Sequence, residues 1–142
     1  MRVMFDINVV LDIVGSRHPF YEDSKNAFLK VIESGDEPFL AIHAYPTIYY
    51  LLGSSTTRDQ REGAMVWVFD SFSAAGAGQR ELAVARKLPM PDFEDALVAS
   101  AASSAGCDLI LTRNEADFAA SPIKALSPKK FIRVEDKGKI KR

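Results

Sequence analysis

Cysteine is almost absent from this chain, and the architectures that depend on it are excluded. Cys107 is the only cysteine among 142 residues, so neither a disulfide framework nor a cysteine-based zinc site is available. The net charge is only −1, and the surface as a whole therefore offers no general attraction for nucleic acid or anionic lipid. No apolar run reaches the roughly 18 residues of a membrane span, and the first residues lack the features of a signal peptide. We therefore expect a cytoplasmic protein.

The composition does provide enough apolar material for one core. With 47% hydrophobic and 26% charged residues, a chain of 142 residues matches a single globular domain. We assign residues 1–134 to this domain and residues 135–142 to a basic tail, which should be solvated because chain ends are poorly ordered unless tied down. The basic residues of the tail are Lys137, Lys139, Lys141 and Arg142.

Short apolar runs alternate with longer amphipathic segments along the chain. The apolar runs predict strands at residues 2–5, 39–42 and 109–111, with 72–78 and 131–134 compatible with two further short strands. Helical spacing predicts helices at residues 8–14, 21–33, 46–52, 59–73, 79–87, 92–105 and 115–119. The expected buried side of the 59–73 helix is Met65, Val66, Val68 and Phe69. This alternation implies an α/β fold with a mainly parallel sheet of four or five strands covered on both faces.

Carboxylates and small polar groups follow the apolar runs at places far apart in the sequence. They are Asp6 and Asn8 after the first run, Asp95 at the start of the 92–105 helix, and Thr112, Asn114 and Asp117 after 109–111. In an α/β protein, the carboxyl ends of strands that are distant in sequence share one crevice. Carboxylates gathered there repel one another, and a bound divalent cation is the commonest way to offset that repulsion. The pattern therefore predicts a metal site.

The acidic residues also have purely structural interpretations. Asp6 could cap the helix that follows it, and Asp92 is expected to be the N-cap of the 92–105 helix. Negative charge from Glu94 and Asp95 suits the first turn of that helix. At about 100° per residue, Asp92 and Asp95 share one face, whereas Glu94 is expected to point elsewhere. Asp95 lies one turn inside the helix, so it needs a reason other than capping.

Other polar residues near the expected site keep two interpretations each. Arg113 could meet a substrate phosphate or simply face solvent. His43 follows a buried strand, where a satisfied, half-buried histidine is commoner than a catalytic base. Tyr45, Tyr49 and Tyr50 could stack on unpaired bases, but their helical spacing favours packing or a subunit contact.

Three blocks of the sequence stand in the order and separation of a known family. They read VMFDINVVLD from residue 3, DFEDAL from residue 92 and LTRNEADF from residue 111. Together they resemble the PIN domain, most closely its VapC-type branch of toxins from toxin–antitoxin pairs, over about residues 1–132. The resemblance implies a Rossmann-like, three-layer α/β/α fold. It also implies an acidic cluster that holds Mg²⁺ or Mn²⁺ and metal-dependent cleavage of RNA phosphodiester bonds.

The resemblance implies roles for individual residues. Asp6 corresponds to the first metal carboxylate and Asp95 to the next. Asn114 falls where many members have an acid, and Asp117 supplies a carboxylate three residues on. The implied catalytic residues are Asp6, Asp95 and Asp117. Residues expected to support the ligands are Asn8, Thr47, Asp92 and Thr112.

The chain departs from the family pattern at one position. Many members carry a Glu near the start of the helix after the second strand, but residues 43–50, HAYPTIYY, contain no acid, and Thr47 is the expected occupant. One or two carboxylates can hold Mg²⁺ when substrate phosphate helps. We therefore expect one tightly held ion, a water oriented by Asp95 or Asp117, and a second ion that arrives with the RNA.

Two functions of different classes follow. The first is a metal-dependent endoribonuclease, the toxin of a type II pair, inhibited by an antitoxin whose basic side chain pairs with the carboxylates; the family also suggests a homodimer. The second is a PIN-like protein- or RNA-binding module with little or no catalysis, which the missing Glu supports. A phosphoacceptor receiver domain shares the α/β layout, but the sequence lacks a lysine placed after a late strand to meet the phosphate.

Overall fold

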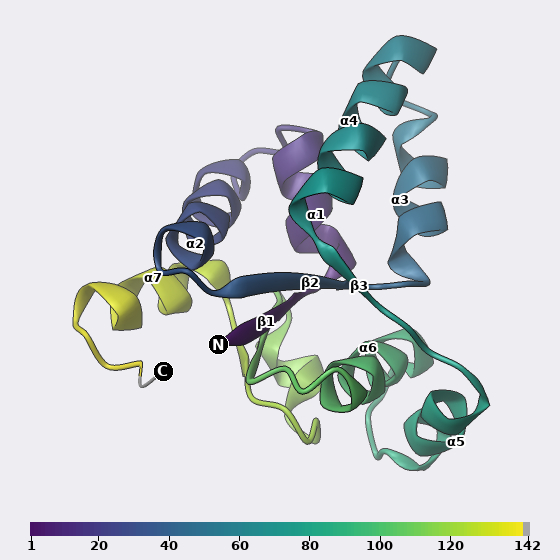
Figure 1. Ribbon diagram of the computed structural model, residues 1–142, viewed down its shortest axis with the longest axis vertical. Helices are drawn as coiled ribbons and strands as arrows, with labels where there is room; N and C mark the ends of the chain where they lie inside the picture. Colours follow the sequence, from purple (N-terminus) through teal and green to yellow (C-terminus); the bar gives the residue numbers. More distant parts are fainter. Residues whose placement is uncertain (141–142) are drawn as a thin grey trace.

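The computed structural model describes residues 1–140. Lys141 and Arg142 of the expected basic tail lie outside the described residues. Five strands form one sheet in the order β3-β2-β1-β4-β5 (Figure 1), and all neighbouring strands pair in parallel, which confirms the mainly parallel sheet predicted from the sequence. The strands are β1 (Arg2–Phe5), β2 (Glu37–Ala41), β3 (Ser73–Ala75), β4 (Leu109–Leu111) and β5 (Ala125–Leu126).

Helices cover both faces of this sheet. In Figure 1, α1 to α4 lie on one side of the strands and α5 and α6 on the other, which gives three layers. The helices are α1 (Ile7–Val14), α2 (Tyr21–Glu33), α3 (Ala44–Leu52), α4 (Arg58–Ser71), α5 (Gln79–Lys87), α6 (Phe93–Ser104) and α7 (Pro128–Asp136), with the short 3-10 helix η1 (Glu115–Phe118) between β4 and β5. None of the helices within residues 1–140 has the length and apolar character that crossing a bilayer would require.

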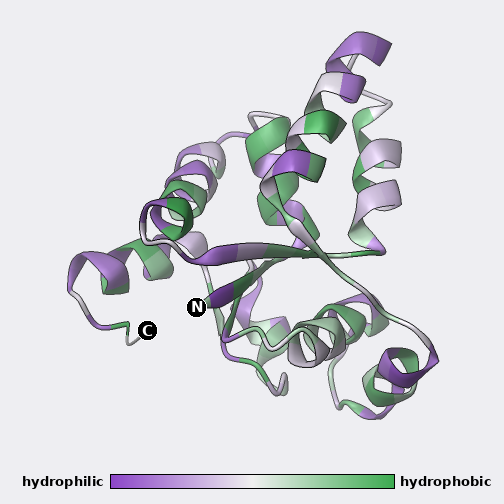
Figure 2. Ribbon diagram, viewed as in Figure 1, coloured by the Kyte–Doolittle hydropathy of each residue, from purple (hydrophilic) through white to green (hydrophobic). Residues whose placement is uncertain are grey.

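Alternation along the central strand divides the core into two layers. Val3 and Phe5 of β1 belong to the cluster packed under α1 to α4, whereas Met4 belongs to the cluster under α6. The register carries the same alternation into β4, because Met4 pairs with Ile110 and Phe5 with Leu111. Figure 2 shows α1 coloured mainly as hydrophobic, as expected for a helix that the other helices cover.

The end of the chain folds differently from the sequence expectation. Residues 131–134 are helical, so the last strand expected there is wrong, and β5 takes its place in the sheet. The helix starts because Ser127 Oγ accepts a hydrogen bond from Lys130 N at 3.2 Å and Pro128 occupies the first turn. Phe131 is completely buried. These start signals outweigh a four-residue apolar run, which is too short to distinguish a strand from a helix.

Helix α7 continues into the segment expected as a tail and ends at Asp136, whose carboxylate lies 2.6 Å from Lys30 Nζ on α2.

The expected buried side of α4 is wrong at two of its four residues. Met65 and Val68 are buried, but Val66 and Phe69 are 56% and 65% exposed. Residues three apart share a helix face, and the face of α4 that carries Met65 and Val68 is the one turned to the core. The short strand expected within 72–78 is confirmed as β3.

Replacing Phe131 with Ala tests whether α7 belongs to the core. We expect Phe131→Ala to lower the free energy of unfolding by about 3–5 kcal/mol, because a fully buried ring is lost and a cavity remains. Lys129→Ala, at an exposed position of the same helix, should change it by less than about 0.5 kcal/mol. Urea unfolding measures both, and equal effects would contradict the packing described.

Candidate functional site

The sheet has a switch point between β1 and β4. From β1 the chain adds β2 and β3 on one side and then returns to add β4 and β5 on the other. Crevices for ligands in open parallel sheets form at the carboxyl ends of strands at such points. Asp6 directly follows β1, and its N–H donates to Leu111 O at 2.9 Å. Thr112 directly follows β4, so these two residues lie abreast at the edge where the sequence predicts the site.

Asp6 is a buried carboxylate held by two hydrogen bonds. Its side chain is fixed because Oδ1 accepts from Ile7 N at 2.9 Å and Oδ2 accepts from Thr112 Oγ1 at 2.8 Å. Thr112 is itself completely buried, and its Oγ1 accepts from Asn114 N at 3.1 Å. Burial raises the pKa of Asp6, and the two hydrogen bonds oppose that rise. Asp6 therefore caps α1, as its structural interpretation has it, and also presents a carboxylate at the switch point.

Asp95 lies in the first turn of α6 and is half-buried. Its N–H donates to Asp92 Oδ1 at 2.9 Å, which confirms Asp92 as the N-cap. Burial, together with the negative charges around it, raises the pKa of Asp95 to about 7. The charged groups responsible, in order of decreasing effect, are Asp6, Asp92, Asp117 and Glu94. The charges of Asp6 and Asp117, the two other acids expected from the sequence, thus act on Asp95.

Glu94 is exposed on the first turn of α6, and its charge acts on residues of the same group. Its negative charge raises the pKa of Asp6 and of Asp95. It also opposes the burial that lowers the pKa of His43, the residue just beyond β2.

The start of α3 holds Thr47, the residue expected in place of the acid that the family resemblance implies. Thr47 is half-buried, and its Oγ1 donates to the backbone oxygen of His43 at 3.2 Å, so the hydroxyl is used inside the helix. His43 is half-buried as expected, but both of its ring nitrogens are buried without a hydrogen-bond partner in the structure. The interpretation of His43 as a satisfied histidine is therefore wrong. Its low pKa keeps the ring neutral near pH 7.

Asp117 and Asn114 lie in the segment after β4 and differ in how they contact the site. Asp117 is half-buried, its N–H donates to Asn114 O at 3.0 Å, and its charge reaches Asp95. Asn114 is exposed, and its side chain does not cap η1. Asn114 contacts the site through its backbone, because its N–H donates a hydrogen bond to Thr112 Oγ1. Asn8 is half-buried in the first turn of α1.

These carboxylates fit Mg²⁺ or Mn²⁺ in donor type, since both ions prefer hard oxygen ligands. Their mutual repulsion is the condition that a divalent cation relieves. Among residues 1–140, no three Asp, Glu, His or Cys side chains converge closely enough to hold an ion. The carboxylates therefore fit the ion in the kind of ligand atom they offer and not in their positions. Asp6 is fixed by its hydrogen bonds, and the other carboxylates lie nearer the surface.

Comparisons with known proteins agree with this architecture. A family model described as PIN domain matches residues 2–116. The fold is similar to VapBC2 from Rickettsia felis bound to a DNA fragment from its promoter, with a TM-score of 0.69, 13% identity, and coverage of 89% of this chain and 98% of that one. The fold is also similar to VapBC-1 from nontypeable Haemophilus influenzae, with a TM-score of 0.70, 13% identity, and coverage of 91% of this chain and 99% of that one. A toxin–antitoxin complex from Klebsiella pneumoniae matches with a TM-score of 0.64, 19% identity, and coverage of 89% of this chain and 97% of that one. A search of curated proteins found no match.

Asp95→Asn tests the charge repulsion in the metal-free protein. The raised pKa means that the unfolded chain loses this proton first as pH rises from about 4, so folding stability falls until about pH 7 and then stays low. We expect Asp95→Asn to raise the melting temperature by a few degrees at pH 8 and by much less at pH 5. Asp59→Asn, an exposed first-turn acid of α4, should not raise it at either pH. Calorimetric melting without metal measures this, and a lower melting temperature for Asp95→Asn at pH 8 would contradict it.

Proposed function

Because the chain belongs to the PIN-domain family, we propose that it is a metal-dependent endoribonuclease that hydrolyses RNA phosphodiester bonds. The observation that carries the proposal is the gathering of carboxylates at the switch point, where Asp6 is fixed and Asp95 has a pKa of about 7. Membership of this family also removes the receiver-domain interpretation. The proposed fold branch is the VapC type, which the three similar structures support.

Asp6, Asp95 and Asp117 would hold the ion, with Asn114 as a further oxygen donor. Each oxygen of Asp6 accepts one hydrogen bond in the structure and keeps a lone pair for a cation. When bound, Mg²⁺ or Mn²⁺ would supply positive charge for the scissile phosphate and make a bound water more acidic. Asp6 is the anchor of this set because its position is fixed by Ile7 and Thr112.

Asp95 is the proposed base. With a pKa of about 7, its carboxylate can take a proton from water near neutral pH while the water oxygen bonds to phosphorus and the bond to the leaving oxygen breaks. The leaving oxygen takes a proton from solvent. Asp117 orients the water from the opposite loop. Bound positive charge would lower the pKa of Asp95 below this value, which would keep its carboxylate ionised at neutral pH.

Glu94 is proposed to replace the family acid that α3 lacks. Its charge acts on Asp6 and on His43, and His43 stands at the start of α3, the segment where the family acid would lie. Thr47 cannot serve as that acid, because it has no charge and its hydroxyl is bonded within the helix. A carboxylate reaching the site from α6 would thus give it a fourth acid.

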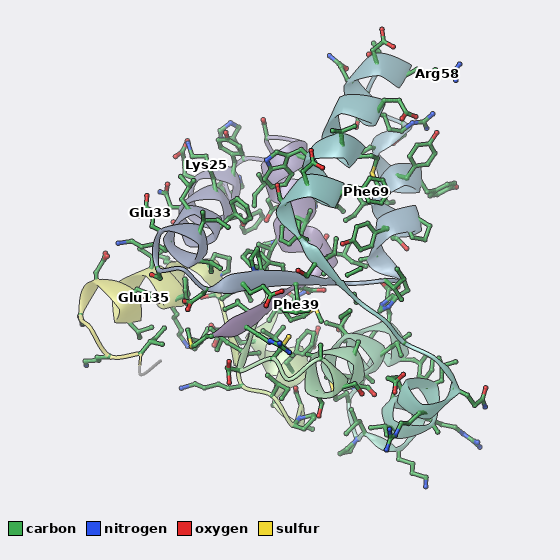
Figure 3. All side chains as sticks on the ribbon, viewed as in Figure 1. Lys25, Glu33, Phe39, Arg58, Phe69 and Glu135 are labelled. Atoms are coloured by element: carbon green, nitrogen blue, oxygen red, sulfur yellow. The ribbon has the colours of Figure 1, made fainter. Side chains whose placement is uncertain are left out.

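The proposed partners are an RNA substrate, an antitoxin and a second copy of this chain. An antitoxin would inhibit by placing a basic side chain among the carboxylates, in competition with the cation. Exposed apolar side chains on α3 and α4 support the homodimer: Tyr50, Leu51, Val66 and Phe69. Phe69, labelled in Figure 3, stacks on Tyr45 at 5.6 Å between ring centres. A cytoplasmic location remains a prediction.

One observation favours the alternative of a catalytically weak binding module. Thr47 stands in place of the family acid, and the carboxylates within residues 1–140 do not converge as a ligand set. A protein of this kind would bind RNA or a partner with no dependence on Mn²⁺. The two functions therefore separate in a metal titration combined with a cleavage assay.

Asp6→Asn and Glu94→Gln test the nuclease directly. We expect Asp6→Asn to abolish both Mn²⁺ binding and cleavage of single-stranded RNA, because it removes the anchoring charge. Glu94→Gln should slow cleavage about tenfold or more, since it removes one acid from the set. Glu22→Gln, an exposed first-turn acid of α2, should leave cleavage unchanged. Wild-type protein that binds no Mn²⁺ in calorimetry would refute the proposal and support the binding module.

Phe69→Glu tests the homodimer. A charge placed in an apolar interface costs several kcal/mol, so we expect the dimer to dissociate at micromolar concentration in sedimentation analysis. Val84→Glu serves as the control, because Val84 is an apolar residue of α5 that is 44% exposed on the other side of the sheet. A monomeric wild type, or a dimer that survives Phe69→Glu, would contradict this interface.

A further inference from the structure

A buried charge network lies beside the acidic site and is not part of it. Asp12 on α1 is completely buried, yet its carboxylate meets polar groups from three other segments. Its Oδ2 lies 3.2 Å from Arg113 Nε and accepts a hydrogen bond from Ser24 Oγ at 3.1 Å, and its Oδ1 lies 3.6 Å from Arg17 Nε. A buried carboxylate is costly unless it is paired, and even then a buried ion pair adds little net stability. Net stabilisation of the fold is therefore a weak explanation for this network, and we look for another role.

Arg113 connects this network to the site. It follows Thr112, the residue that bonds Asp6, and it begins the loop that leads to Asp117. Its side chain is only 19% exposed and stacks on the ring of Phe20 at 4.0 Å. The guanidinium is thus held by a carboxylate on one element and an aromatic ring on another. An arginine so fixed limits where the backbone on either side of it can lie.

We propose that Asp12 is a positioning residue of the site: through Arg113 it fixes the loop 112–117, so that Thr112 stays bonded to Asp6 and Asp117 stays among the carboxylates. The expected solvent-facing alternative for Arg113 does not apply, because the side chain is largely buried. Its Nε and Asp12 form an ion pair, although this nitrogen has no hydrogen-bond partner among the described residues. This inference rests on the proposed function for its catalytic consequence but not for its structural one.

The chain offers a matched control. Arg17 contacts the same carboxylate, but the loop between α1 and α2 that carries it contributes no residue to the acidic site. A purely structural role for Asp12 predicts that both variants, Arg17→Gln and Arg113→Gln, lower stability without an effect confined to the site. A positioning role predicts an effect on the site for Arg113→Gln alone. Both variants remove a guanidinium from the same carboxylate, although Arg17 is 42% exposed and only Arg113 also stacks on Phe20.

Three readouts are measured on both variants and on Asp12→Asn. The first is Mn²⁺ affinity by calorimetry, which we expect to fall about tenfold or more for Arg113→Gln and Asp12→Asn and less than twofold for Arg17→Gln. The second is cleavage of single-stranded RNA, where kcat should fall and KM stay nearly constant for the same two variants. The double variant Asp12→Asn/Arg113→Gln should resemble Arg113→Gln, because the two residues act as one unit.

The third readout needs no metal. The amide of Asn114 donates to Thr112 Oγ1, so its hydrogen exchange reports whether the loop is fixed. We expect faster exchange in Arg113→Gln and Asp12→Asn and wild-type exchange in Arg17→Gln. Unchanged exchange in Arg113→Gln overturns the inference, as does an equal loss in Arg17→Gln. A wild type that neither binds Mn²⁺ nor cleaves RNA refutes the proposed function alone, because the exchange result still decides the positioning role. Should Asp12→Asn fail to fold, the pair of arginine variants carries the test.

Discussion

The hydrogen bond from Thr112 Oγ1 to Asp6 Oδ2, 2.8 Å long, ties together the two strand ends on which the site is built. It exists because β1 and β4 are neighbours in a parallel register that sets Phe5 beside Leu111, so the residues that follow them emerge side by side. A slip of one residue would turn Asp6 and Thr112 to opposite faces. The apolar alternation of the two strands resists such a slip, and the core thereby fixes the chemistry at its edge.

Charge repulsion is the cost of this arrangement. Burial of Asp95, together with the charges of Asp6, Asp92, Asp117 and Glu94, raises its pKa to about 7. Functional sites are commonly less stable than the rest of a fold for this reason. In the proposed function the same repulsion would favour a bound cation, because positive charge would offset it.

Local patterns predicted most of the fold, and contacts between distant residues account for what they missed. The runs that form β1 and β4 and the cap formed by Asp92 are visible in short windows of sequence, and so is Asp6. The helical state of α7 depended on a Ser-Pro start that a four-residue apolar run obscured. The effect of the Glu94 charge on Asp6 and the pairing of Asp12 with Arg113 depend on the tertiary fold, which one sequence does not record.

Proton release on Mn²⁺ binding tests the central claim, that repelling carboxylates form a cation site, most directly. Calorimetry at pH 6.5 in two buffers of different ionisation enthalpy gives the number of protons released per ion bound. A pKa near 7 for Asp95 predicts release of roughly three quarters of a proton in wild type and nearly none in Asp95→Asn. Binding without proton release would contradict the repulsion described here, and the absence of any Mn²⁺ binding would contradict the cation site itself.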